Sequence, residues 1–257
     1  MSLPLYIMQS FTALVRPPGV NFPQAISSHP AKEEIDLSRA REQHRSYVNA
    51  LKKAGAKILA MPPEDSLPDS TFVEDTAFVF EGRVFLCFLK EETRRSEMES
   101  IEKTLKGYRK IVRLPPYLDG GDILDTPDSI FIGLSGRTDA KAIENLSQQI
   151  NKKVVAVPIL KGLHLKSAVS YLGNNILLLN PGRVDSSAFK SFQWIEVEEK
   201  NSYAANCLAM GDLIFMPAGF PMVRKKILKQ GFETIELEMS EFEKADGGVT
   251  CLSIIIP

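Results

Sequence analysis

The chain repeats one order of apolar and polar positions along most of its length. In the clearest copy, the apolar runs TAFVF and RVFLCFL flank Glu81-Gly82, and the amphipathic segment RRSEMESIEKTLKGY precedes the apolar run KIVRLP. Short apolar runs around a Gly-containing turn are typical of a β-hairpin, whereas apolar residues at helical spacing are typical of a surface helix. This copy therefore predicts two strands, a helix and a third strand.

Three further copies follow in the same order. They are DILDT, SIFIGLS, DAKAIENLSQQI and KKVVAVPI; AVSYLG, NILLLNP, SSAFKSF and WIEVE; and NCLAMG, LIFMPAG, MVRKKILKQG and TIELE. A fifth copy is divided between the ends of the chain, because the C-terminal TCLSIII joins ALVRPP, a helix over residues 33–55 and KILAMP. We predict that the two ends pair and close a ring, as in propeller-like folds.

Each copy opens on a polar turn. The turns contain Asp75, Asp119, His164, Asn206 and Cys251, which follow one another at steps of 44, 45, 42 and 45 residues. A nearly constant period of this size indicates repeated units that pack against their neighbours. Equivalent positions of a closed ring point towards one axis, so these five side chains are predicted to meet in one pocket.

The composition is that of an ordinary globular protein, and we expect one domain over residues 1–257, with residues 1–3 left over from cloning. Apolar residues make up 44% and charged residues 25% of the chain, and the formal net charge is −1. This charge gives no general attraction to nucleic acid or to an anionic membrane. No apolar run is long enough to span a bilayer, and the N-terminus lacks the features of a signal peptide. Three cysteines without a CxxC pair argue against a disulfide framework, so we expect a cytoplasmic protein.

Cys251 is a candidate nucleophile. A free cysteine is most often a core residue, and this interpretation is kept for Cys87 and Cys207, which lie inside apolar runs. Cys251 instead follows an Asp-Gly-Gly turn and has the same repeat position as His164. A thiolate with a histidine partner attacks acyl and amidine carbons. A core cysteine is the alternative interpretation of Cys251.

His164 is the matching candidate for acid–base chemistry, because imidazole changes its protonation near neutral pH. A structural histidine is the alternative, since Leu163 and Leu165 flank it. The remaining histidines, His29 in a loop and His44 on the first helix, are expected to be solvated.

The acidic residues Glu74, Asp75 and Asp119 lie where strand residues would be expected. Paired carboxylates bind a planar guanidinium through parallel, charge-assisted hydrogen bonds, although surface turns also explain such acids. One histidine without a second cysteine nearby is a poor transition-metal set, and the spacing of a calcium loop is absent, so we expect no metal and no cofactor. Arg94 and Arg137, after the second strands of neighbouring copies, are candidates for a carboxylate clamp. Together these charges fit an arginine-like ligand.

Seven segments of the chain, in the order in which they occur, resemble the dimethylarginine dimethylaminohydrolases of the pentein (arginine-modifying enzyme) superfamily. The segments are LPDSTFVEDTAF, LDGGDIL, GLSGRTDA, LHLKSA, EEKNSYAANCLAM, MPAGFP and EFEKADGGVTCLSI. The similarity extends from about Val15 to the end, and the chain lacks the length of arginine deiminases and amidinotransferases. The resemblance implies a five-bladed α/β propeller with pseudo-fivefold symmetry, which agrees with the repeat period.

The resemblance also implies roles at the reacting end of the ligand. Cys251 would be the nucleophile and His164 the acid–base catalyst. Asp75 and Asp119 would hold the guanidinium, with Glu74 supporting them. Some bacterial members of the family carry Glu where this chain has Asp119.

At the amino-acid end, the resemblance implies that Arg94 and Arg137 bind the α-carboxylate and that Asp69 binds the α-amino group. Backbone groups near Ile26, on an N-terminal lid, and near Ala245 would complete this end.

The implied reaction is hydrolysis of Nω-methylated or dimethylated arginine to citrulline and an amine, through a covalent thiouronium on the cysteine. The alternatives are hydrolysis of arginine or another guanidine, and a non-catalytic propeller that only binds its ligand. We expect a small arginine derivative as the partner, and a monomer or homodimer.

Overall fold

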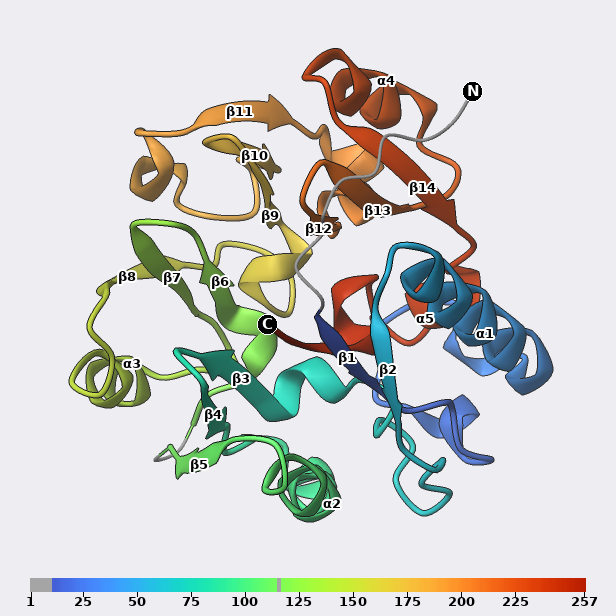
Figure 1. Ribbon diagram of the computed structural model, residues 1–257. Coiled ribbons are helices and arrows are strands. Elements are labelled where there is room, and N and C mark those ends of the chain that lie inside the picture. Colours follow the sequence, from blue (N-terminus) through green and yellow to red (C-terminus); the bar gives the residue numbers. More distant parts are fainter. Residues whose placement is uncertain (1–10, 115–116) are drawn as a thin grey trace.

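The computed structural model describes residues 11–114 and 117–257, so the expectation for residues 1–3 lies outside the described residues. Five three-stranded sheets surround a common axis (Figure 1). In each sheet the middle strand pairs antiparallel with the inner strand and parallel with the outer one. The fold is the predicted five-bladed α/β propeller.

The blades follow the order of the sequence, from inner to outer strand. They consist of β15 (Ile254–Ile256), β1 (Thr12–Val15) and β2 (Lys57–Ala60); β3 (Ala77–Phe80), β4 (Arg83–Leu86) and β5 (Lys110–Arg113); β6 (Ile123–Asp125), β7 (Ser129–Leu134) and β8 (Lys153–Pro158); β9 (Val169–Gly173), β10 (Ile176–Leu179) and β11 (Gln193–Glu196); and β12 (Leu208–Met210), β13 (Leu213–Pro217) and β14 (Glu233–Leu237).

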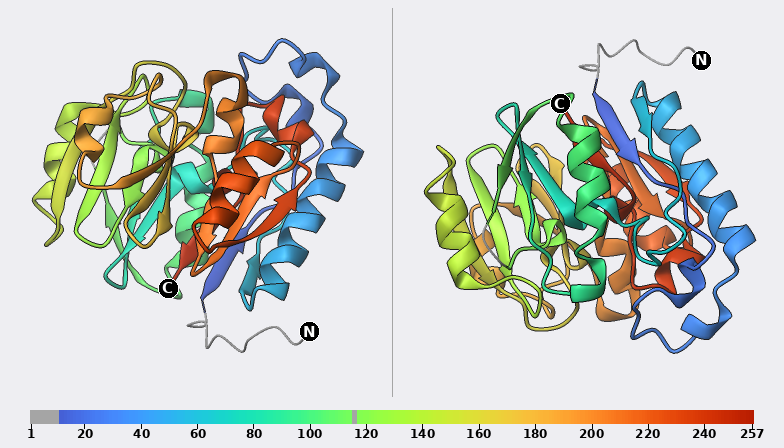
Figure 2. Two further views of the ribbon diagram at one scale, coloured as in Figure 1. Left: turned by 90° about the horizontal axis from the view of Figure 1, so that it is seen from above. Right: turned by 90° about the horizontal axis from the view of Figure 1, so that it is seen from below.

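The first blade closes the ring with strands from both ends of the chain. β1 pairs antiparallel with β15, with Thr12 opposite Ile256 and Leu14 opposite Ile254. Both views in Figure 2 show these two strands side by side. The predicted pairing of the two ends is therefore confirmed.

Helices lie at the rim of the propeller (Figure 1). They are α1 (Leu37–Lys53), α2 (Glu97–Leu105), α3 (Ala140–Ser147) and α4 (Pro221–Lys229), with the short α5 (Ser240–Glu243) after the last blade. The first helix was predicted to begin at residue 33 but begins at Leu37. The reason is the Asp36 carboxylate, which accepts hydrogen bonds from the backbone N–H groups of Ser38 and Arg39 and caps the helix there.

The predicted helix over SSAFKSF is a single 3-10 turn, Ser186–Phe189. Only Phe189 in this turn is buried. One apolar anchor does not supply the stripe over several turns that stabilises a surface α-helix. The fourth blade therefore connects its strands without an α-helix.

Apolar side chains fill the space between each pair of neighbouring blades, in five separate clusters. Alternate residues of a middle strand enter different clusters: Val84 and Leu86 pack against the first blade, and Phe85 packs against the third. A strand buried on both faces needs a continuous apolar run, which explains the sequence RVFLCFL. Cys87 and Cys207 belong to these clusters, as predicted.

The prediction that His44 is solvated was wrong. His44 is buried and its Nε2 has no hydrogen-bond partner among the described residues. It lies on the face of α1 that also carries Ala40, Tyr47 and Leu51, because residues three, four and seven apart share one side of a helix. Burial lowers the pKa of His44 to about 4, so this imidazole is neutral at pH 7.

None of the helices within residues 11–114 and 117–257 combines the length and the apolar character needed to cross a bilayer.

Candidate active site

A cavity of about 790 Å³ is lined by residues of all five polar turns, among them Glu74, Gly121, His164, Asn206 and Cys251. Each turn contains a 3-10 helix that precedes the inner strand of its blade. The convergence predicted from the repeat period is confirmed for the histidine, the asparagine and the cysteine. The two aspartates of the same repeat positions lie directly behind this lining.

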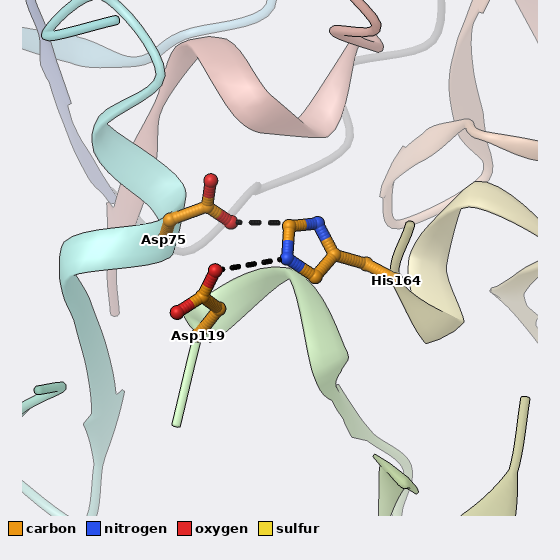
Figure 3. A group of neighbouring side chains, drawn as sticks. All are labelled: Asp75, Asp119 and His164. Atoms are coloured by element: carbon orange, nitrogen blue, oxygen red, sulfur yellow. Dashed lines mark hydrogen bonds and ion pairs between the residues drawn. The ribbon is translucent and has the colours of Figure 1, made fainter. Parts of the chain in front are cut away.

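His164 lies between two buried carboxylates (Figure 3). Its Nε2 is 3.1 Å from Oδ2 of Asp119, and its Nδ1 is 3.8 Å from Oδ1 of Asp75. Burial by itself would lower the pKa of His164, but the charges of Asp75, Asp119 and Asp122 outweigh it and raise this pKa to about 9. The imidazole is therefore protonated at neutral pH.

Asp119 has no exposed surface. One carboxylate oxygen, Oδ2, contacts the imidazole, and the other, Oδ1, has no hydrogen-bond partner among the described residues. In this arrangement Asp119 contacts His164 and is covered from the cavity. This placement differs from the expectation that Asp119 contacts a guanidinium.

Arg94 is also buried, behind Asp75. Its Nη1 donates to Oδ2 of Asp75 at 2.7 Å, and its Nε and Nη2 donate to the two oxygens of Glu97 at 2.9 and 3.0 Å. All these contacts are internal, and Arg94 does not line the cavity. The structure thus does not place Arg94 where the expected carboxylate clamp would need it.

Asp75 is held in its charged form by its neighbours. Burial would raise the pKa of Asp75, but the positive charges of His164 and Arg94 lower it to about 2. Its Oδ1 also accepts a hydrogen bond from the Gly121 N–H at 3.1 Å. A side chain on Gly121 would collide with both Asp75 and His164, so this position requires glycine.

Asp122, three residues after Asp119, ties the histidine turn to its surroundings. Its Oδ1 accepts the Leu165 N–H at 2.8 Å, and its Oδ2 accepts the hydroxyls of Ser135 and Thr138 at 2.6 and 2.7 Å. The Thr138 hydroxyl in turn accepts the Asp119 N–H. The sequence analysis assigned no role to Asp122, because its partners lie 13, 16 and 43 residues further along the chain.

The Cys251 side chain is half-buried at the cavity wall. Its Sγ accepts the Gly248 N–H at 3.3 Å. Burial raises the pKa of the Cys251 thiol, and the carboxylates of Glu74 and Asp75 raise it further. Without a bound cation, the neutral thiol is therefore favoured.

Arg137 is the predicted arginine that lines the cavity. Its side chain is 15% exposed, and its Nη1 lies 3.8 Å from Glu91. That nitrogen is buried without a hydrogen-bond partner among the described residues. An unsatisfied guanidinium N–H beside a cavity is suited to an anionic ligand group.

The segment expected to form a lid lines part of the cavity. Ile26 lines the cavity, and its backbone N–H donates to both oxygens of Asp69, at 3.1 and 3.3 Å. The backbone N–H and the hydroxyl of Ser28 both donate to Asp246 Oδ2, at 2.6 and 2.9 Å. Asp69 and Ala245 are buried next to the cavity and do not line it. Ser28 and Asp246 were missed in the sequence, because 218 residues separate the two partners.

Asp75, Asp119 and His164 offer ligand atoms that all lie within 4.8 Å of one another. That spacing would suit a shared cation. However, Arg94 and the Gly121 N–H already occupy the two oxygens of Asp75. The donor set therefore fits a hydrogen-bonded imidazolium better than a metal ion.

Comparison with known proteins agrees with this geometry. The family model for N,N dimethylarginine dimethylhydrolase, eukaryotic, matches residues 21–256. The N(G),N(G)-dimethylarginine dimethylaminohydrolase of Pseudomonas aeruginosa is 37% identical over 235 residues, which are 89% of this chain and 92% of that protein.

Two solved structures are similar over nearly the whole chain. One is a cysteine-to-serine mutant of dimethylarginine dimethylaminohydrolase (DDAH) from Pseudomonas aeruginosa, complexed with citrulline. It has a TM-score of 0.90 and 31% sequence identity, and the match covers 98% of this chain and 100% of that one. The other is a histidine-to-glycine mutant of dimethylarginine dimethylaminohydrolase, as an adduct with S-methyl-L-thiocitrulline. It has a TM-score of 0.90 and 33% sequence identity, and the match covers 97% of this chain and 100% of that one. The likeness includes all five blades and their turns.

Proposed function

Because the chain belongs to the dimethylarginine dimethylaminohydrolase family, we propose that it hydrolyses Nω-methylated or dimethylated arginine to citrulline and methylamine or dimethylamine. The observation that carries this proposal is the meeting of Cys251, His164 and buried carboxylates at one cavity that Arg137 also lines. A thiol, a protonated imidazole and negative charge suit attack on a cationic guanidinium carbon. Related proteins have been solved with citrulline and with S-methyl-L-thiocitrulline.

In the first step, the bound guanidinium lowers the pKa of Cys251, the thiol releases its proton to solvent, and the thiolate adds to the guanidinium carbon. His164 then donates its proton to the substituted nitrogen, the bond from carbon to that nitrogen breaks, and the amine leaves. A thiouronium bonded to Cys251 remains. The pKa of about 9 for His164 supports this order, because the general acid already carries its proton at neutral pH.

In the second step, the neutral imidazole of His164 removes a proton from water. The resulting hydroxide adds to the thiouronium carbon, the carbon–sulfur bond breaks with its electron pair on sulfur, and the hydroxyl proton passes to solvent, so that citrulline and the Cys251 thiolate are released. Asp119 supports both steps through the imidazole, because its Oδ2 stabilises the protonated ring. Asp75, kept ionised by His164 and Arg94, supplies the negative charge for the guanidinium.

We assign Arg94 to this support of Asp75 and Arg137 to the α-carboxylate. Asp69, together with the backbone near Ile26 and Ala245, is assigned to the amino-acid end. Glu74 belongs to the cavity floor, where it bonds Lys166 and Thr250.

Replacing Arg137 with alanine should weaken binding of amino-acid substrates by about 2–4 kcal/mol, because a desolvated charged contact is lost. Binding of methylguanidine, which has no carboxylate, should stay nearly the same. Kd values for both ligands in wild type and mutant measure this difference. Equal losses of affinity for the two ligands would show that Arg137 supports the fold and does not bind the carboxylate.

A bound guanidinium should lower the pKa of Cys251, because it neutralises the field of Glu74 and Asp75 that raises this pKa. Thiolate absorbance in the ultraviolet, titrated with and without a non-hydrolysable guanidine, measures the shift. The rate of hydrolysis should also have a bell-shaped dependence on pH. Activity should fall as the pH rises through about 9, because His164 then loses its proton. Complete thiolate formation at neutral pH without ligand would contradict substrate-assisted activation.

Citrulline release from dimethylarginine, monomethylarginine and arginine, measured side by side, tests the proposed substrate. Preference for arginine would favour the deiminase-like alternative. Tight binding of all three without citrulline would favour the non-catalytic binding module.

We also propose that residues 1–257 act as one domain, because pairing of the two ends completes the first blade. A cytoplasmic location is supported by three free thiols, Cys87, Cys207 and Cys251. The proposed partner is the small-molecule substrate, with neither nucleic acid nor membrane, and the chain acts as a monomer or homodimer.

A further inference from the structure

A closed ring of hydrogen bonds lies at the floor of the cavity, which three of its four members, Glu74, Lys166 and Asn206, line. Asn206 Nδ2 donates to the Lys166 carbonyl at 2.9 Å and to the Thr250 hydroxyl at 3.0 Å, and Asn206 Oδ1 accepts the Thr250 N–H at 3.0 Å. The Thr250 hydroxyl donates to Glu74 Oε2 at 2.7 Å, and Lys166 Nζ donates to Glu74 Oε1 at 2.5 Å. The Glu74 and Asn206 side chains are both almost fully buried.

Two members of this ring lie close in the sequence to the groups that the proposed reaction uses. Thr250 precedes Cys251, and Lys166 is two residues after His164. These two segments come from different blades, and the Asn206 amide bonds to both. No hydrogen bond within the described residues joins the Cys251 and His164 side chains directly. Their turns are connected through Glu74, which bonds the two side chains Lys166 and Thr250, and through the Asn206 amide, which also holds the backbone of both turns.

We propose that Asn206 is a positioning residue that sets the distance and orientation of Cys251 relative to His164. This inference rests on the proposed function of those two residues. A carboxamide is needed because one end must accept the Thr250 N–H while the other donates to two oxygens. The neighbouring Gly248 permits this approach, since a side chain there would come within 2.4 Å of Asn206 Oδ1.

The effect of losing the amide should fall on the reaction and not on substrate binding. Asn206→Ala removes all three hydrogen bonds but leaves Asp75 and Arg137 in place. Small displacements of reacting groups cost on the order of 10²-fold in rate, so kcat should fall by about 10²-fold while KM changes little. Asn206→Asp should be at least as impaired, because it loses both donors and adds a charge near Glu74.

Asn180→Ala is the matched control. Asn180 is also buried and uses both ends of its amide, donating to Glu199 and accepting from Gly182. The Asn180→Ala variant should be less stable than wild type, measured as a lower Tm, but should keep the wild-type kcat. A kcat of Asn206→Ala within threefold of wild type, at a temperature where both are folded, would overturn the proposal. So would equal losses of kcat in the two alanine variants.

Thr250 tests whether the ring acts as a unit. Thr250→Val keeps the shape but removes the hydroxyl between Asn206 and Glu74, so it should lower kcat, whereas Thr250→Ser should restore most of the rate. If the ring positions Cys251, the double variant Asn206→Ala/Thr250→Val should be little worse than Asn206→Ala alone. Full additivity of the two losses would contradict a shared positioning role.

The rate of Cys251 alkylation by chloroacetamidine separates this proposal from the proposed function. This cationic amidine needs the thiolate beside the carboxylates but does not need turnover. If wild type makes no citrulline, the proposed function fails, while slower alkylation of Asn206→Ala than of Asn180→Ala still supports positioning. Equal alkylation rates in both variants and wild type would overturn positioning even if citrulline is made.

Discussion

Replacing Cys251 with serine should abolish citrulline formation, with a loss on the order of 10⁴-fold or more. An alcohol is far less acidic than a thiol, and the nearby charges of Glu74 and Asp75 already disfavour an anion at this position. The variant should still bind citrulline, because the carboxylates and Arg137 are unchanged. A related cysteine-to-serine mutant has been solved in complex with citrulline.

Cys87→Ser and Cys207→Ser are the matched controls for this experiment. Both thiols are buried in the apolar clusters between blades, and burial raises the pKa of each. These variants should lower the free energy of unfolding but leave kcat nearly unchanged when folded. Retention of one tenth of the wild-type rate by Cys251→Ser would remove Cys251 from the mechanism.

His164→Gln should lower hydrolysis of dimethylarginine by about 10²–10⁴-fold, the usual contribution of a general acid–base group. The variant should still react with S-methyl-L-thiocitrulline, because its leaving group departs as methanethiolate and does not need the proton of His164. The covalent product on Cys251 should then persist, since no base activates water. Mass spectrometry of the intact protein measures this adduct, and a histidine-to-glycine relative has been solved as an adduct with the same compound.

His44→Gln is the control for removal of a buried histidine. His44 lies on α1, with its Nε2 unpartnered among the described residues. This variant should keep the rate of dimethylarginine hydrolysis, and its Tm shows the cost of the substitution alone. Rapid release of the adduct by His164→Gln would mean that another group activates water.

Sequence alone determined the order of the blades and the place of the site. The spacing between Asp75 and Cys251 predicts five turns around one axis, and the structure places a residue of each turn at the cavity. Apolar periodicity is a local property, and closure of a repeat follows from its count, so both can be recognised without coordinates. The pairing of β1 with β15 followed from the same argument.

Only the tertiary structure decided which side of each turn a side chain occupies. Arg94 and Arg137 both follow the second strand of a repeat. The Arg94 guanidinium nevertheless donates its hydrogen bonds to Asp75 and Glu97, whereas Arg137 lines the cavity. Asp119 likewise lies behind the imidazole. These outcomes depend on ion pairs between segments distant in the chain, and such partners leave no periodic signal.

The floor of the cavity shows the same division. The repeat period located Asn206, but not its bonds to Lys166 and Thr250, which lie 40 and 44 residues away. A carboxamide at a repeat position could serve several partners, and the choice depends on how closely neighbouring blades pack. The sequence thus determined which turns meet, whereas close packing at the axis decided which atoms of those turns touch.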